Sequence, residues 1–451
     1  MFRHRPISAK LLAAARPNPL VRFFSAAPSH SPTQFPSTVS LPARTFPRYL
    51  QSTKPGSSLL SLKWPRPPQN LLVVLKLHSE EVVDSVAKFA EYVRSEYPVN
   101  VVVEPRMASI VQKRLSFPIY VADNRSNIAD KIDIVATFGG DGTVLRAASL
   151  FKLHSSVPPI LSFRMGTLSF LCEWDFIEYK KAWREMYMSG SDVAARSAAV
   201  PRPHLGEQGF TDLSGVAGWE LLRGKSLGPS RASKVILRHR IKADVWDGAG
   251  QNMTHQVSDT LASQAKSGIG GNEEPMPSVR AVNEILIRRM PEAPPAIIDI
   301  FQNGHFFTQT VADGILVSTP TGSTAYSLSA GGPIVHPLVR SLLITPICPL
   351  SLSFRSLVLP LDTKVSLRIS PKNRGREMYL KVDGKTCAHV ASGAEVRIEG
   401  EFVGRTAPGE EVHGGVPCVI RSDADTWVGG LNGLLKFNRP FVRGASEDGD
   451  D

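Results

Sequence analysis

The sequence predicts an α/β N-terminal domain with a mostly parallel, Rossmann-like sheet, followed by a β-rich, β-sandwich-like C-terminal domain. In the first part of the chain, apolar runs of strand length alternate with amphipathic helical patterns, as is typical of a parallel sheet. In the later part, short alternating strands dominate, and Asn303-Gly304 between two of them is a strong hairpin signal. The predicted boundaries are 68–175 and 176–420, and a chain of 451 residues is long enough for both domains.

Residues 1–67 precede the first predicted domain and are rich in Arg, Ser, Ala and Pro, without any acidic residue. Residues 1–24 can be drawn as a helix with its basic side chains on one side, which is typical of a mitochondrial transit peptide. This pattern predicts passage through the mitochondrial import machinery into the matrix. A disordered basic tail is the alternative, whereas a secretory signal would need an uninterrupted apolar core. The Pro- and Ser-rich residues 28–68 are predicted to be a disordered linker or further presequence.

The formal net charge of +11 arises before the first acidic residue, Glu80, because 11 Lys and Arg residues precede it. From Glu80 onward basic and acidic residues are equal in number, so the charge does not favour a nucleic-acid partner. No apolar run approaches the roughly 18 residues that a transmembrane helix needs, so membrane insertion is not expected. The four cysteines are far apart in the sequence, which indicates neither a zinc site nor a disulfide framework.

The first domain begins with an apolar strand over residues 70–77. Ser79 suits the N-cap of the following helix, in which apolar residues recur at helical spacing up to Tyr97. Further strands are expected over 100–104, 132–138 and 159–163, and further helices over about 107–115, from Val144 onward and over 177–188.

The strand over 132–138 runs into the turn Gly139-Gly140-Asp141-Gly142-Thr143. Glycines let the backbone approach a ligand closely, and the unpaired N–H groups of a helix N-terminus favour an anion such as a phosphate. Asp141 is unexpected there, because a carboxylate repels a phosphate unless it has a chemical role. An ordinary αβ turn with an aspartate N-cap is the alternative.

In the second domain, strands are expected over 234–246, 279–288, 297–311, 365–369, 378–382 and 395–399, with loop insertions at about 198–231 and 247–278. Asn283-Glu284 places an amide and a carboxylate within an otherwise apolar strand. Residues 311–333 concentrate glycines, small residues and hydroxyl groups, which suits the binding of a phosphate or a ribose. Asp383-Gly384 is predicted to be a structural turn between two strands.

Together these motifs resemble the NAD kinase family. The resemblance rests on Gly139–Thr143, Asn283-Glu284, Asp313-Gly314 and the run from Thr319 to Pro333, and it extends over residues 70–438 apart from the two insertions. Within the family the chain is similar to the fungal mitochondrial NADH kinases. Diacylglycerol and sphingosine kinases carry a similar Gly-Gly-Asp-Gly-Thr turn, but they lack the Thr-Pro-Thr-Gly-Ser-Thr-Ala-Tyr run.

The resemblance implies the NAD kinase fold, with the site in the cleft between the two domains. It implies transfer of the γ-phosphoryl group of ATP, bound with Mg²⁺, to the 2′-hydroxyl of the adenosine ribose of NAD⁺ or NADH. Asp141 is then the catalytic residue, which either takes the proton of this hydroxyl or orients the hydroxyl. The resemblance also implies a homo-oligomer, either a dimer or a tetramer. Residues 421–451 would return to the first domain and end in an acidic tail.

The resemblance assigns the remaining site residues one by one. Gly142 lies against the same substrate, and Arg146 matches a basic position near phosphate. Asn283 and Glu284 match the pair that contacts the ribose and the nicotinamide side of the dinucleotide. The other substrate-binding residues are Gly139, Gly140, Thr143, Asp313, Thr324, Ala325, Tyr326, Ser327, Leu328 and Ser329, and no side chain is expected to bind a metal.

Two positions depart from the usual pattern. Ser169 replaces the second glycine of the usual Gly-Thr-Leu-Gly-Phe-Leu turn, and this has a cost if the position needs a positive φ. Leu350 stands where a histidine is frequent. The alternatives to an NAD(H) kinase are a lipid kinase and a non-catalytic NAD(H)-binding sensor, in which the pocket is kept and turnover is lost.

Overall fold

The structure, a computed structural model, describes residues 35–51, 59–122, 128–166, 169–190, 232–257, 278–405 and 412–421, together with Trp427, Gly430, Leu431, Gly433 and Leu435. The predicted transit peptide, the first loop insertion, most of the second insertion and the acidic tail lie outside the described residues.

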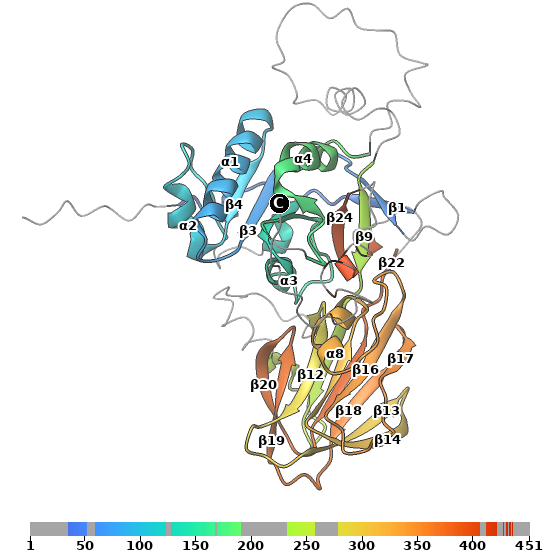
Figure 1. Cartoon of the computed structure of the whole chain (residues 1–451). Coiled ribbons are helices and arrows are strands. Elements are labelled where there is room, and N and C mark those ends of the chain that lie inside the picture. The colour runs from blue at the N-terminus through green and yellow to red at the C-terminus, as the bar shows by residue number, and fades with distance from the viewer. Residues whose placement is uncertain are drawn as a thin grey trace, which may run out of the picture. The chain divides into compact units, whose positions relative to one another are not determined.

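A mixed sheet of ten described strands forms the first part of the fold, in the order β1-β2-β9-β24-β7-β6-β3-β4-β5 with β8 beside β7 (Figure 1). The strands from β24 to β5 run parallel, whereas β1, β2 and β9 pair antiparallel. The mostly parallel α/β domain is therefore confirmed. The bounds are β1 (Arg48–Gln51), β2 (Leu60–Lys63), β3 (Asn70–Leu75), β4 (Asn100–Val103), β5 (Tyr120–Val121), β6 (Ile134–Gly139), β7 (Ile160–Arg164), β8 (Trp174–Asp175), β9 (Lys234–Arg238) and β24 (Val416–Ile420).

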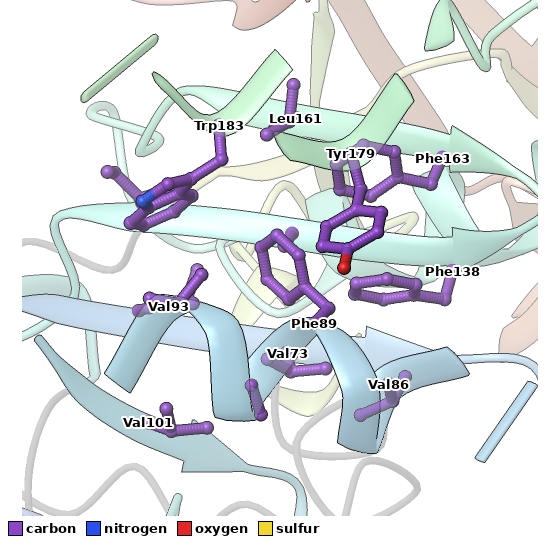
Figure 2. Packing of buried hydrophobic residues seen from close by; sticks show 14 of the residues in the cluster. Val73, Val86, Phe89, Val93, Val101, Phe138, Leu161, Phe163, Tyr179 and Trp183 are labelled. Carbon is purple, nitrogen blue, oxygen red and sulfur yellow. The ribbon is translucent and has the colours of Figure 1, made fainter. Parts of the chain in front are cut away.

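Helices cover both faces of this sheet because its central strands are apolar on both sides. Leu71 and Val73 of β3 face the helices α1, α2 and α4, while Leu72 and Val74 face α3. On the first face, the ring of Phe89 lies 5.1 Å from that of Phe138 (Figure 2). Such fully buried strands read as continuous hydrophobic runs. The helices are α1 (Glu80–Glu96), α2 (Pro105–Gln112), α3 (Asp141–Ser149) and α4 (Tyr179–Tyr187), with 3₁₀ turns η1 (Thr38–Ser40), η2 (Ile128–Asp130) and η3 (Phe176–Glu178).

Two antiparallel sheets of six strands each form the β-rich part, and their inner faces share one apolar cluster, as in a sandwich. The predicted Asn303-Gly304 turn joins β13 to β14. The first of these sheets contains β11 (Val279–Ala281), β10 (Ile241–Trp246), β21 (Glu395–Gly400), β18 (Val365–Ile369), β13 (Ala296–Gln302) and β14 (His305–Ala312). The second contains β17 (Leu357–Pro360), β16 (Ser341–Ile347), β15 (Gly314–Ser318), β12 (Glu284–Arg289), β19 (Glu377–Val382) and β20 (Lys385–Ala391). A small ribbon pairs β22 (Gly404–Arg405) with β23 (Val412–His413).

The structure differs from the expectation for residues 35–67, which were predicted to be presequence or disordered linker. Strands β1 and β2 pair with each other, and β2 extends the first sheet through β9. Leu62 and Trp64 are fully buried, and the indole N–H of Trp64 donates to the carbonyl of Met186. The segment is rich in proline and serine and its strands are short, and β2 joins the sheet by pairing with the distant strand β9, Leu60 lying opposite Val235.

The predicted strand over 234–246 is in fact two strands in different sheets. β9 pairs with β24 in the first sheet, whereas β10 belongs to the sandwich. The break falls at His239-Arg240, where the buried guanidinium of Arg240 pairs with Glu401. The predicted domain boundaries at 175 and 420 therefore do not separate the sheets, since β9 and β24 return to the first one.

No helix among the described residues is both long and apolar enough to cross a membrane.

Candidate active site

The predicted phosphate turn lies between β6 and α3, at the carboxyl end of a central parallel strand. Gly139 is the last residue of β6, Gly140 is the N-cap of α3, and Asp141 is its first residue. A Cβ on Gly139 would lie 2.2 Å from the hydroxyl oxygen of Thr143, so only glycine fits there. At Gly140 and Gly142, in contrast, a Cβ would meet no atom of the described residues within 4 Å. The described part of the chain therefore does not require these two glycines, and it leaves space for a ligand beside them.

The carboxylate of Asp141 is held by the turn that follows β7. Oδ1 accepts a hydrogen bond from the hydroxyl of Ser169 and one of 2.8 Å from the backbone N–H of Leu171. Oδ2 accepts one of 3.2 Å from the N–H of Phe170. The two glycine-containing turns, at the ends of the neighbouring strands β6 and β7, thus meet at Asp141. The structure resolves the question about Ser169, because φ is positive at only four described non-glycine residues and Ser169 is not one of them.

Arg146 lies one turn further along α3, and its guanidinium is paired with a carboxylate. Its Nε and Nη2 both donate to Glu104, whose side chain is only 4% exposed and which also pairs with Arg106. Burial raises the pKa of Glu104, while the charge and hydrogen bonds of Arg146 lower it. The positive charge of Lys385, on the β20 hairpin, acts on both Glu104 and Arg146. The predicted phosphate-binding arginine is therefore already oriented by a buried acid.

Glu284 is the first residue of β12 and Asn283 precedes it, and Asp383 organises the backbone around them. The carboxylate of Asp383 accepts hydrogen bonds from the N–H groups of Val282, Asn283 and Glu284, at 3.0, 2.7 and 3.2 Å. Asp383 itself has a φ of 46°, in the turn between β19 and β20. The Asp383-Gly384 turn is thus structural, as predicted, and it is also what supports the Asn283-Glu284 pair.

The side chains of Asn283 and Glu284 each carry a buried acceptor atom to which no described residue donates a hydrogen bond. Oδ1 of Asn283 and Oε2 of Glu284 are buried and have no hydrogen-bond partner among the described residues. Buried polar atoms are almost always hydrogen-bonded in a native protein. Each of these two acceptors is therefore suited to a ligand that supplies a hydroxyl or amide donor.

Burial, together with the charge of Asp383, raises the pKa of Glu284 to about 7, against a hydrogen bond from the backbone of Gly384 that lowers it. Its folded-state pKa thus lies above the ordinary value of 4.5. The folded chain holds this proton more tightly than the unfolded chain, so stability is lost as the pH rises from about 4.5 to about 7.

We expect Glu284→Gln to remove this pH dependence. Between pH 4.5 and 7, the free energy of unfolding of the wild type should fall relative to that of the variant by about 2–3 kcal/mol. Urea unfolding at a series of pH values measures this difference. Glu292→Gln, at an exposed position between β12 and β13, serves as the control. Parallel pH profiles for the wild type and Glu284→Gln would contradict the prediction.

The run from Thr319 onward packs against Asn283. The N–H of Thr319 donates to the carbonyl of Asn283 at 2.9 Å, and its hydroxyl donates to the carbonyl of Val282 at 2.5 Å. A Cβ on Gly322 would lie 2.1 Å from the carbonyl oxygen of Asn283, which explains why glycine is needed at this close approach. The two clusters, distant in sequence, therefore form one structural unit.

The predicted residues Thr324–Ser329 form a short turn of helix over the outer face of the second sandwich sheet, in η4 (Thr321–Thr324) and α8 (Tyr326–Ser329). The ring of Tyr326 packs against Leu286, Leu316 and Ile347. Ser327 is fully buried and its hydroxyl lies 3.1 Å from that of Thr345. The structure thus gives Tyr326 and Ser327 packing roles, whereas Thr324, Ala325 and Leu328 are half-buried and Ser329 is exposed.

The Asp141 helix and the Asn283 region meet in one apolar cluster. Val282 packs in the same cluster as Val144, Ala147 and Ala148, the buried face of α3. The charge of Asp383 also acts on Lys152, just beyond the end of α3, and burial lowers the pKa of that lysine to about 8. The side chains predicted from separate motifs are therefore brought to one region of the fold.

Asp313 is the exception. Strands β12 and β15 pair antiparallel, with Glu284 opposite Ser318 and Arg288 opposite Gly314. Asp313 therefore lies at the far end of the pair from Glu284, and it accepts a hydrogen bond of 2.6 Å from Nε of Arg289. Its assignment to the dinucleotide pocket stays a prediction. Leu350 is 66% exposed in the loop after β16.

Sequence reasoning missed the supporting acids and bases of this region. Glu104 and Lys385 stand in ordinary strand-end positions, and no local pattern distinguishes them. Ser169 was noticed only as a departure from a glycine, although its place in the turn after a parallel strand was a usable signal. Among the described residues, no group of three His, Cys, Asp or Glu side chains is arranged to hold a metal ion.

Comparison with known proteins agrees with this arrangement. Residues 71–190 match the model of the ATP-NAD kinase N-terminal domain, and residues 282–401 match that of the ATP-NAD kinase C-terminal domain. A mitochondrial NADH kinase of Schizosaccharomyces pombe is 33% identical over 90% of this chain and 85% of its own length. A mitochondrial NADH kinase of Saccharomyces cerevisiae is 30% identical over 86% of this chain and 85% of its own.

A solved structure is also similar. The crystal structure of yeast NADH kinase in complex with NADH superimposes on this chain with a TM-score of 0.66 at 28% sequence identity. The aligned region covers 90% of this chain and 98% of the yeast chain.

Proposed function

The chain belongs to the ATP-NAD kinase family, and we propose that Asp141 is the catalytic residue of a kinase that acts on NAD(H) in the mitochondrial matrix. Its activity is the ATP-dependent phosphorylation of NAD(H) to NADP(H). The observation that supports the assignment is the carboxylate of Asp141 at the first residue of α3, between two glycines with open space beside them.

In the proposed step, the 2′-oxygen of the adenosine ribose attacks the γ-phosphorus of ATP. The bond from this phosphorus to the β,γ-bridging oxygen breaks, ADP leaves, and the proton of the 2′-hydroxyl passes to Asp141. Mg²⁺ enters with ATP as part of the substrate and neutralises charge on its phosphates. The N–H groups at the start of α3 then face the anionic side of the reaction.

The acceptor substrate is placed by the Asn283 region. Oδ1 of Asn283 and Oε2 of Glu284 are unsatisfied acceptors, and each is suited to a ribose hydroxyl or a carboxamide N–H of the dinucleotide. Arg146 supplies positive charge near the phosphates, with Glu104 holding its guanidinium in place. The protein works as a homo-oligomer and reaches the matrix through the mitochondrial import machinery, which its basic N-terminal sequence fits.

The full-length chain, incubated with Mg–ATP and either NAD⁺ or NADH, should produce ADP and NADP(H) in equal amounts. An NADP-specific dehydrogenase measures the product, and the ratio of the two rates establishes which redox form is preferred. Diacylglycerol and sphingosine, offered as acceptors in parallel, should give no phosphorylated lipid. A chain that forms no NADP(H) from either dinucleotide, or that phosphorylates the lipids instead, would refute the proposed function.

A further inference from the structure

Ser169 contributes a side-chain donor to the carboxylate of Asp141. The serine lies in the turn after β7, is 8% exposed, and donates its hydroxyl proton to Oδ1 of Asp141. The family resemblance predicts a glycine at this position, which has no side chain to offer. The hydrogen bond is therefore a feature of this chain and not of the Gly-Gly-Asp-Gly-Thr turn itself.

The surrounding backbone directs this hydroxyl. Oγ of Ser169 accepts hydrogen bonds from the N–H of Cys172 at 3.0 Å and from that of Leu171 at 3.3 Å. A hydroxyl has one proton to donate and two lone pairs to accept with. Since both lone pairs face N–H groups, the single proton is left to point at Asp141. The serine is thus set as a donor to the carboxylate.

The bonds to Asp141 are unequal on its two oxygens. Oδ1 has two donors, the hydroxyl of Ser169 and the N–H of Leu171 at 2.8 Å. Among the described residues, which omit 167–168 of this turn, Oδ2 has one donor, the N–H of Phe170 at 3.2 Å. Fixing Oδ1 sets the plane of the carboxylate and leaves Oδ2 with spare acceptor capacity. We propose that Ser169 is a positioning residue, which orients Asp141 so that Oδ2 receives the substrate hydroxyl. This inference rests on the role proposed for Asp141.

The test compares Ser169, in the turn after β7, with Ser162, in β7 itself. Ser169→Ala removes the donor to Asp141. Ser162→Ala is the matched control, because the hydroxyl of Ser162 in β7 also ties this turn: it donates to the carbonyl of Leu171 and accepts from the N–H of Glu173, both at 3.1 Å. No hydrogen bond joins it to Asp141 among those described, so it reports the structural cost alone. Ser169→Thr retains a hydroxyl and tests for rescue.

We expect Ser169→Ala to lower kcat by about 10- to 100-fold, the effect of losing a hydrogen bond to a charged group, with KM for NAD(H) and ATP unchanged. The acidic limb of the kcat pH profile should move to higher pH, because the ionised carboxylate loses a donor that favours it. Ser169→Thr should restore kcat toward the wild type. Ser162→Ala should lower the melting temperature but leave the acidic limb where it is.

Three outcomes would overturn the inference in a wild type that makes NADP(H). In the first, Ser169→Ala keeps the wild-type kcat and pH profile. In the second, Ser162→Ala shifts the acidic limb as much as Ser169→Ala does, which would make the effect structural. In the third, Ser169→Ala raises kcat, which would mean that the contact restrains Asp141. A wild type without activity would instead refute the proposed function, so the two failures are distinguishable.

Discussion

Replacement of Asp141 by asparagine is expected to lower kcat by about 10²- to 10⁴-fold, the range for loss of a general base, while dinucleotide binding stays measurable. The amide has nearly the same shape as the carboxylate, and its oxygen can still accept from the N–H of Leu171. It cannot take a proton from the substrate hydroxyl. The binding acceptors on Asn283 and Glu284 belong to other elements and are untouched.

Steady-state formation of NADP(H) measures the loss, and isothermal titration with the dinucleotide measures the retained binding. Asp362→Asn, at an exposed position between β17 and β18, is the matched control and should behave as the wild type. If Asp141→Asn turns over at a near-normal rate, Asp141 has no part in the chemistry.

A second large effect is expected on stability, from Glu401→Gln. Both oxygens of Glu401 accept from the guanidinium of Arg240 at 2.7 Å, and Oε1 also accepts from Arg280 at 2.7 Å. The side chain of Arg240 is 1% exposed, and it also donates to the carbonyls of His154 and Ser155 in the loop after α3. Neutralising Glu401 leaves a buried cation without its counter-charge, which costs about 3–5 kcal/mol in the free energy of unfolding.

Urea unfolding measures this loss. The matched control is Glu399→Gln, two residues earlier, because Glu399 pairs with Lys242 where both side chains are about one-third exposed, at 34% and 31%. An exposed pair contributes about 0–1 kcal/mol. Equal destabilisation by the two variants would mean that burial does not increase the contribution of the Arg240–Glu401 pair to the free energy of unfolding. Because Arg240 also holds the loop that follows α3, the active-site helix should lose rigidity along with global stability.

Short-range patterns were sufficient for the architecture. The central strands β3 and β6 are buried on both faces, so their apolar runs are continuous and visible without any knowledge of partners. The β13–β14 hairpin follows from Asn303-Gly304, where Asn303 has the positive φ of 51° that such a turn needs. The strands β1 and β2 were missed because they are short, and they join the sheet only through the pairing of β2 with β9.

The Gly139–Thr143 turn and the Asn283-Glu284 pair were predictable for a different reason. Each is a set of adjacent residues whose chemistry conflicts with its surroundings: a carboxylate in a phosphate turn, and a polar pair in a buried strand. Asp313 was assigned from the family resemblance instead, and that assignment stays a prediction. It belongs to a recognisable motif, yet the antiparallel register of β12 and β15 carries it away from Glu284 and toward Arg289.

Local sequence was enough to predict the central strands and helices, the glycine turn and the residues that bear chemical groups, because these depend on neighbours along the chain. The strands β1 and β2, the split between β9 and β10 and the contacts of those groups became apparent only in the fold. Asp141 meets Ser169, Arg146 meets Glu104, and the N–H of Asn283 meets Asp383 a hundred residues away. Such pairs form when separate strands end at the same edge of a sheet, and local sequence does not indicate which strands will be neighbours. We propose that the glycine turn marks the acceptor side of the reaction, and the turn after β7 donates the hydrogen bonds that hold its carboxylate.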